Sequence, residues 1–221
     1  MKNSLVVFWD WNGTIINDAQ LFVDLMNVFL KEKKLPAINV KEYREKFEFP
    51  IIEYYRQLGF DFSNESFDDL GLRFIHNYKK ERFKANLFSG IVDVLCLLQQ
   101  HDCKQFVVSA QENSLLLSAI KHYGLEKFFV HASGVKNVYA KGKISAALKL
   151  KKTFLNNDNC KVFVVGDSLY DLRVARSLGA TPVLVSFGHY SRRRLEDKNC
   201  ILLDSVNDLK NFFLTQIKGV D

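Results

Sequence analysis

The second half of the chain alternates short runs rich in Val, Ile and Phe with longer segments whose apolar residues recur every three or four positions. Short apolar runs indicate buried strands, and the three-to-four spacing indicates amphipathic helices. Strands that alternate with helices in this way form a parallel sheet flanked by helices. The sequence therefore predicts an α/β fold.

The first third of the chain has a different pattern. Residues 17–85 carry helical periodicity and no buried strand, whereas residues 1–16 and 86–221 contain all the expected strands. We therefore expect a core domain from the two outer segments and an inserted helical domain at 17–85. The expected strands are 5–10, 104–109, 128–132, 161–166, 181–186 and a weak edge at 201–203. The expected helices are 19–31, 41–46, 51–58, 70–83, 91–100, 113–122, 144–154, 168–178 and 206–217.

Composition narrows the class of protein. The 221 residues are 48% hydrophobic and include only 3 Pro, which is typical of a compact globular chain. The first apolar run is broken by Asp10, too early for a signal peptide or a membrane span. The four cysteines form no C-x-x-C pair, which favours reduced, buried thiols and a cytoplasmic protein.

The net charge of +6 comes from basic residues scattered among acidic ones. Without a nucleic-acid motif, such charges are typical of solvated helix faces. We therefore expect no nucleic-acid partner and no membrane partner, and a monomer by default.

Polar residues stand where the expected strands end. Asp10 ends the first strand, Ser109 the second, and Asp167 follows the fourth, with Asp171 four residues later. Ligands of open α/β sheets bind beyond the carboxyl ends of the strands. Singly each residue has an ordinary structural explanation, such as a helix N-cap, but together they predict a site at this edge.

In order, these residues read Asp10-Trp11-Asn12-Gly13-Thr14, Ser109, Lys143 and Gly166-Asp167 with Asp171. The chain thereby resembles the haloacid dehalogenase (HAD) superfamily, close to its phosphoglycolate phosphatase-like branch. The resemblance spans essentially the whole chain and implies a Rossmann-like core with a type C1 α-helical cap at residues 17–85.

The resemblance also implies roles for these residues. Asp10 is the expected nucleophile, which forms an aspartyl-phosphate that water then hydrolyses. Mg²⁺ is the expected cofactor, held by Asp10, the backbone carbonyl of Asn12 and Asp167, with Asp171 as a further ligand or as a residue that orients the metal's waters. The expected substrate is a small phosphorylated metabolite.

The expected phosphate-binding groups are hydrogen-bond donors. They are the Ser109 hydroxyl, the Lys143 ammonium and the backbone N–H groups of Trp11 and Ala110. We prefer Lys143 to Lys141 because Lys143 directly precedes the apolar pattern of a helix, but Lys141 stays open as the alternative.

Asn12 departs from the family pattern, which has a second acid at this position. An amide cannot supply or accept the proton of the leaving group, so general acid–base catalysis is lost. Three functions stay open: a slow or specialised phosphatase, for example of acyl phosphates; another HAD reaction, on phosphonates or carbon–halogen bonds; and a phosphorylated-ligand binder. On this basis Asn12→Asp should raise turnover of alkyl phosphates.

Two of these alternatives are less well supported. The phosphonate branch uses a cap lysine, and no lysine lies between Phe47 and Tyr78; the dehalogenase branch does not use the acidic pair. Retention of Asp10 argues against a pure binder. Residues 48–56 are the expected cap segment facing the site, in which Arg56 either pairs with a substrate carboxylate or lies exposed.

Overall fold

The computed structural model describes residues 4–135, 142–155, 160–196 and 198–219. Its main sheet has six parallel strands in the order β5-β4-β1-β6-β7-β8, which confirms the expected α/β fold. The strands are β1 (Ser4–Trp9), β4 (Lys104–Glu112), β5 (His131–Val135), β6 (Cys160–Gly166), β7 (Thr181–Val185) and β8 (Ile201–Leu203).

Strand β1 lies inside the sheet and is buried on both faces. Val7 and Trp9 point into one core cluster, and Val6 and Phe8 into another. This arrangement explains why the run is apolar at every position rather than at every second one. The helices on the first face are α5 (Ile91–Gln100), α6 (Asn113–His122) and α10 (Val206–Lys218); those on the second are α7 (Lys143–Phe154) and α8 (Leu169–Leu178).

The expected strand at 128–132 was wrong in its position. Phe128 ends a 3-10 turn, η2 (Glu126–Phe128), and the residue is buried in the core, with 5% of its surface exposed. The strand β5 begins only at His131 and contains few apolar residues because it forms the edge of the sheet. The apolar signal therefore came from a packed turn and not from the strand.

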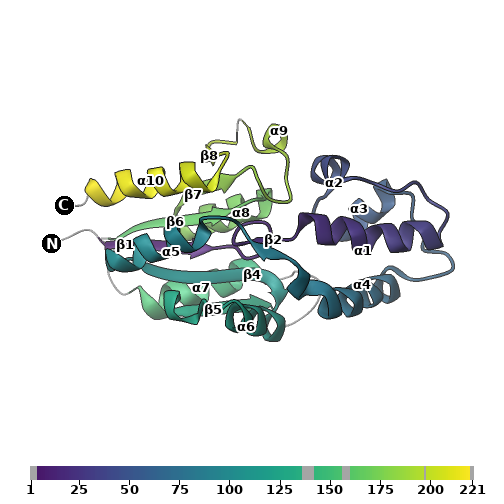
Figure 1. The fold of residues 1–221 in the computed structure, drawn as a ribbon, viewed down its shortest axis with the longest axis horizontal. Helices are drawn as coiled ribbons and strands as arrows, with labels where there is room; N and C mark the ends of the chain where they lie inside the picture. Colours follow the sequence, from purple (N-terminus) through teal and green to yellow (C-terminus); the bar gives the residue numbers. More distant parts are fainter. Residues whose placement is uncertain (1–3, 136–141, 156–159, 197, 220–221) are drawn as a thin grey trace.

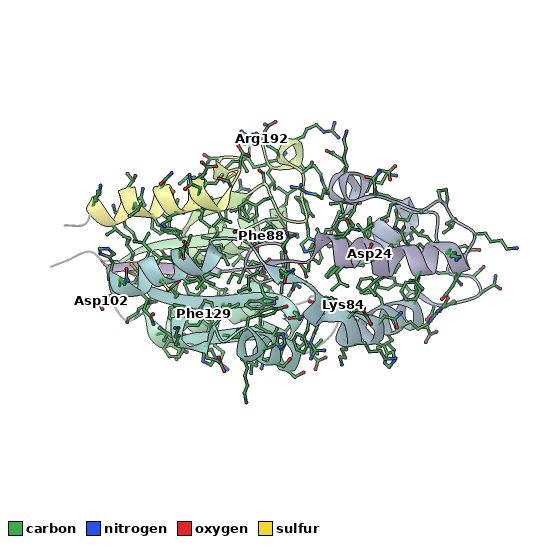
Figure 2. All side chains as sticks on the ribbon, in the orientation of Figure 1. Asp24, Lys84, Phe88, Asp102, Phe129 and Arg192 are labelled. Carbon is green, nitrogen blue, oxygen red and sulfur yellow. The ribbon has the colours of Figure 1, made fainter. Side chains whose placement is uncertain are left out.

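Residues 17–85, the expected cap and called the cap below, contain α1 (Ala19–Glu32), α2 (Val40–Lys46), α3 (Ile51–Gln57), α4 (Phe67–Glu81) and the short turn η1 (Arg82–Lys84). Its four α-helices lie beyond one end of the parallel sheet (Figure 1). The two chain crossings pair as a small antiparallel ribbon, β2 (Ile16–Asn17) with β3 (Asn86–Leu87), which we had not predicted. Phe88, labelled in Figure 2, directly follows this ribbon. Its ring packs on Phe187, with ring centroids 4.6 Å apart.

The cap helices share a core of their own that continues onto the main domain. Phe29, Tyr43 and Leu70 are each 1% exposed in the same cluster that includes Leu184 of β7. The cap is thus packed against the sheet end where the polar residues gather.

Sequence signals define two of the helix starts in the cap: Asn39 caps α2 in a capping box with Glu42, and Ser66 caps α4.

Two expectations about composition can be compared with the structure. None of the described helices is long and apolar enough to cross a membrane. None of the four cysteines, all of which are described, is in a disulfide, but only Cys103 is buried; Cys96, Cys160 and Cys200 are half-buried rather than buried as expected.

Candidate active site

Three carboxylates meet beyond the carboxyl ends of β1 and β6. Asp10 follows β1, Asp167 follows β6, and Asp171 lies in the first turn of α8; one oxygen of each lies within 4.8 Å of the other two. All three are buried, with exposures of 8%, 2% and 0%. The parallel register of β1 and β6 brings residues distant in sequence to one place.

Burial and mutual repulsion make this cluster costly when all its members are charged. Burial raises the pKa of Asp10 to about 8, the charge of Asp171 adds to this rise, and Lys143 opposes it. Burial likewise raises the pKa of Asp167 to about 6, opposed mainly by His189. Ionised carboxylates are unfavourable in this site, and a bound cation would offset their charge.

Lys143 supplies one positive charge to the cluster. Its Nζ donates to Asp10 Oδ1 at 2.6 Å and to Asp171 Oδ1 at 2.5 Å, and the residue is 3% exposed. Burial alone lowers the pKa of Lys143, but the charges of Asp10 and Asp171 outweigh it and raise the pKa above its ordinary value. Lys143 is the first residue of α7, as expected; the alternative, Lys141, lies outside the described residues.

Asp171 also serves the local structure of α8. Its Oδ2 accepts hydrogen bonds from the Ser168 hydroxyl at 2.6 Å and from the Ser168 N–H at 3.1 Å, which completes a capping box. With Oδ1 held by Lys143, both oxygens already have donors. The geometry therefore favours Asp171 as the residue that orients Lys143.

Two glycines allow the loops around Asp167 to close. Gly13 has φ +72°, and a Cβ there would overlap the Asp167 carboxylate and the His189 ring. A Cβ on Gly188 would overlap Asp167 and the backbone of Gly13. Because Gly188 leaves this space open, the His189 N–H can donate to Asp167 Oδ2. Gly13 is thus required by close packing and by its backbone conformation.

The side chain of Asn12 is held by groups from the cap side. Its Nδ2 donates to Asp18 Oδ2 at 2.5 Å and to the Tyr78 hydroxyl at 2.9 Å. Asp18 is 1% exposed, and its Oδ1 also accepts from the Gly13 N–H at 3.0 Å. A carboxylate accepts hydrogen bonds, so the amide nitrogen of Asn12, and not its amide oxygen, faces Asp18. The amide oxygen Oδ1 is the side-chain atom that remains to interact with other groups.

His189 connects this group to the cap. Its Nε2 lies 3.1 Å from Asp18 Oδ1, and its Nδ1 lies 2.7 Å from the hydroxyl of Tyr43 on α2. Burial lowers the pKa of His189, but the charges of Asp18 and Asp167 outweigh it and raise the pKa above its ordinary value. A cationic ring there would offset part of the charge of both carboxylates.

The expected phosphate-binding residues lie in different environments. Ser109 is 1% exposed and sits where the β4–β5 register shifts, because β4 continues to Glu112 instead of ending at Ser109 as expected. Its Oγ accepts from the Gln111 N–H at 3.1 Å, which leaves its own proton to donate. Ala110 is half-buried beside it, and the Trp11 side chain packs in the core against Tyr123.

A cavity of about 570 Å³ lies between these residues and the cap. Asp10, Asn12, Ser109, Ala110, Lys143 and Asp167 line its inner end. The opposite wall comes from all four cap helices and is largely aromatic. The expected facing segment 48–56 contributes Phe49, Pro50, Ile51, Ile52, Tyr54 and Tyr55 to the lining.

Several site residues escaped the sequence analysis. Asp18 directly precedes α1 and reads as an ordinary N-cap, yet its side chain makes no cap hydrogen bond. His189 and Gly188 follow the fifth expected strand, whose end carries none of the residues of the family pattern. Tyr78 carries the apolar periodicity of α4, so only the fold shows that its hydroxyl reaches Asn12.

Comparison with known proteins gives a family match over most of the chain. A model described as haloacid dehalogenase-like hydrolase matches residues 7–185. The chain is 24% identical over 192 residues to a phosphoglycolate phosphatase of Caulobacter vibrioides, covering 85% of this chain and 81% of that protein. It is 21% identical over 174 residues to the pyrophosphatase PpaX of Listeria monocytogenes, covering 77% and 78%.

Solved structures share the fold. The structure of Protein Tyrosine Kinase A of Mycobacterium tuberculosis superposes with a TM-score of 0.77 at 20% identity, covering 96% of this chain and 99% of that chain. At this identity the likeness shows the fold alone.

Proposed function

The chain belongs to the haloacid dehalogenase-like hydrolase family, and we propose that it is a Mg²⁺-dependent hydrolase of phosphate monoesters that works through an aspartyl-phosphate on Asp10. The family match and the similarity to phosphatases confirm the resemblance drawn from the motifs and the enzyme class, an HAD-type phosphatase. The single observation that carries the proposal is the buried cluster of Asp10, Asp167, Asp171 and Lys143 at the inner end of the cavity.

The donor set fits a magnesium ion. Three buried carboxylates with raised pKa values for Asp10 and Asp167 are hard oxygen ligands whose charges need compensation. Asp10 and Asp167 are the favoured carboxylate ligands, together with the backbone carbonyl of Asn12, since both oxygens of Asp171 already accept hydrogen bonds. Bound there, Mg²⁺ would neutralise a phosphate dianion and position it.

The remaining residues act on the phosphoryl group. Asp10 attacks phosphorus in line, and its carboxylate is freed for this when the Lys143 ammonium shifts toward the phosphate oxygens. Ser109 donates its hydroxyl proton to the same oxygens, as do the backbone N–H groups of Trp11 and Ala110. Asp171 keeps Lys143 in place.

Asn12 determines which leaving groups the proposed enzyme can release. Its amide is fixed by Asp18 and Tyr78, so it offers a carbonyl oxygen that can orient a water or a leaving group but cannot protonate one. The proposed phosphatase is therefore slow on esters whose alcohols need protonation, and more effective where the leaving oxygen is stable as an anion.

Residues 17–85 act in this proposal as a cap that closes the site from water during transfer. The expected location in the cytoplasm, the monomeric state and the absence of nucleic-acid partners stay predictions.

The test is a panel of phosphate esters with and without Mg²⁺, followed by intact-mass detection of the phosphoenzyme after acid quenching. We expect a Mg²⁺-dependent phosphoryl group on the parent and none on Asp10→Asn, with turnover reduced by about 10⁴-fold or more. Circular dichroism of the variant controls for folding. Tight binding of a phosphorylated compound without phosphoenzyme or turnover would replace this proposal with the phosphorylated-ligand binder.

A further inference from the structure

The cavity has two chemically different walls. Its inner end carries the charged side chains Asp10, Lys143 and Asp167. Its cap wall is formed by apolar and aromatic residues: Phe22, Met26, Tyr43, Phe47, Phe49, Pro50, Ile51, Ile52, Tyr54, Tyr55, Phe67, Phe74, Ile75 and Tyr78. Such a wall contacts the part of a substrate that leaves with the oxygen, because the phosphoryl group is bound at the inner end.

The cap, which is described throughout, contributes no cationic side chain to this wall; Asp68 is its one charged lining residue. Arg56, the cap residue that we considered as a partner for a substrate carboxylate, is not in the lining. Its side chain is 54% exposed and pairs with Glu53 at 2.5 Å. Of the two alternatives for Arg56, the structure therefore supports the exposed helix residue.

Two nearby arginines serve the structure instead. Arg44 donates to the backbone carbonyls of Ser186 and Tyr190, and Arg194 donates to that of Phe47. Neither lines the cavity. A second anionic group on a substrate would thus be moved from water to aromatic rings without a counter-charge from the cap, which is strongly unfavourable.

Two unpaired polar atoms of the cavity lining, one in the cap wall and one on β4, are neutral. The Tyr54 hydroxyl and Gln111 Oε1 are buried and have no hydrogen-bond partner among the described residues, and both residues line the cavity. Gln111 Oε1 only accepts hydrogen bonds, so it suits a hydroxyl or an amide N–H of a ligand and not a carboxylate. The Tyr54 hydroxyl can donate or accept.

Asn12 provides a second, independent constraint. Without an acid to protonate the leaving oxygen, hydrolysis favours alcohols that leave as stable anions. A phenol, with a pKa of about 10, leaves far more readily than an alkanol. The volume of about 570 Å³ is ample for an aromatic ring system in addition to the phosphate.

We propose that the substrate is a phosphate monoester of an uncharged aromatic alcohol, whose ring packs against the cap wall. The inference rests on the proposed phosphatase function and narrows it: small substrates with a second anionic group, such as phosphoglycolate and pyrophosphate, are disfavoured because the cap provides no cation for that group and the His189 ring already faces Asp18. The reaction breaks the phosphorus–oxygen bond, leaves the phenolate in the cavity, and transfers the phosphoryl group to Asp10 and then to water.

The test compares kcat/KM of the full chain with Mg²⁺ for four compounds. They are 1-naphthyl phosphate, 4-carboxyphenyl phosphate, naphthylmethyl phosphate and phosphoglycolate; the second adds a charge, and the third changes the leaving oxygen to an alkanol. We expect 1-naphthyl phosphate to exceed phosphoglycolate by about 10³-fold and each of the other two by about 10-fold or more.

A matched pair of variants tests the cap wall itself. Ile75→Lys places a cation in the lining, whereas Leu72→Lys places one on the exposed face of the same helix, α4. We expect Ile75→Lys to reduce the preference for 1-naphthyl over 4-carboxyphenyl phosphate by about 10-fold, and Leu72→Lys to leave it unchanged.

The outcomes separate the two proposals. Efficient Asp10-dependent hydrolysis of phosphoglycolate, or equal rates on neutral and carboxylated aryl esters, would overturn the aromatic-substrate inference and leave the phosphatase standing. Absence of turnover and phosphoenzyme with every ester would overturn both. Calorimetry with Asp10→Asn should still detect binding of 1-naphthyl phosphate, and no binding would count against the inference.

Discussion

The two ends of the cavity differ in the chemistry of their side chains. At the core end, the side chains of Asp10, Asp167, Asp171 and Lys143 are almost fully buried, and Lys143 pairs with Asp10 and Asp171. At the cap end, aromatic rings pack on one another, as in the stacked pair Tyr43 and Phe47 with centroids 5.0 Å apart. The core end is therefore specific for charge and geometry, and the cap end for shape and apolar surface. In the proposed enzyme, the core end performs the reaction and the cap end selects the substrate.

The largest effect is expected from the cation of the core end. Lys143→Met leaves Asp10 and Asp171 buried without their partner, so we expect the free energy of unfolding to fall by about 3 to 5 kcal/mol in metal-free buffer. We also expect kcat to fall by about 10²-fold or more. Urea unfolding and steady-state kinetics measure the two effects.

Lys151→Met is the matched control on the same helix, since Lys151 is half-buried and donates to a backbone carbonyl, that of Leu178, rather than to a carboxylate. It should cost about 1 kcal/mol and leave kcat unchanged. Equal effects of the two substitutions would show that Lys143 is an ordinary helix residue.

The second prediction concerns the junction between the two ends. Asn12→Asp places a carboxylate against Asp18, whose Oδ2 is 2.5 Å from the present amide nitrogen. The geometry therefore revises the expectation from sequence: the single substitution should not raise turnover, because a carboxylate at the half-buried position 12 would be repelled by the buried carboxylate of Asp18. The double substitution Asn12→Asp with Asp18→Asn reverses the pair, and we expect it to raise kcat on alkyl phosphates by about 10²-fold.

Steady-state kinetics on naphthylmethyl phosphate for the parent, both single variants and the double variant complete a double-mutant cycle. A gain in the single Asn12→Asp variant as large as that in the double would show that Asp18 does not control position 12.

The third prediction is the pH dependence of stability without metal. The pKa of Asp10 is about 8 in the fold and that of Asp167 about 6, and both lie above the ordinary value of 3.8. Between pH 3.8 and the native pKa of each group, the native state therefore binds more protons than the unfolded state. Stability is thus greatest at low pH in this range and decreases as the pH rises toward 8. Urea unfolding in EDTA should show this decrease, and Mg²⁺ should reduce it.

Asp10→Asn is the comparison variant, because an amide has no proton to lose. Its unfolding free energy should fall less between pH 6 and 8 than that of the parent. An identical slope would show that Asp10 does not titrate in this interval.

The smallest effect is expected at the cap end. The Tyr54 hydroxyl is buried without a partner among the described residues, whereas the Tyr78 hydroxyl accepts hydrogen bonds from Asn12 and Gln111. Tyr54→Phe should therefore stabilise the chain by about 1 kcal/mol, and Tyr78→Phe should destabilise it by about the same amount. Thermal unfolding of the two variants gives the comparison, and a loss in both would mean that Tyr54 has a hydrogen-bond partner.

Much of the core was predictable because its signals are local. The positions of most strands along the chain follow from apolar runs, and the placement of Asp10, Ser109 and Asp167 follows from the rule that parallel strands end at the same edge. The choice of Lys143 over Lys141 also rested on a local signal, the start of an apolar helical pattern. Strand β5 was misplaced because an edge strand carries little apolar character, and a packed turn carries more.

The sequence by itself determined the α/β core and the set of charged residues that meet in it. The reason is that buried strands and their ends can be predicted from the pattern of apolar and polar residues next to one another in the chain. Only the tertiary structure decided how Asn12 is oriented, which arginines face away from the cavity, and that Asp18 and His189 belong to the site. These features depend on contacts between residues 6 to 171 positions apart, and side-chain direction across such distances is fixed by packing rather than by any local pattern.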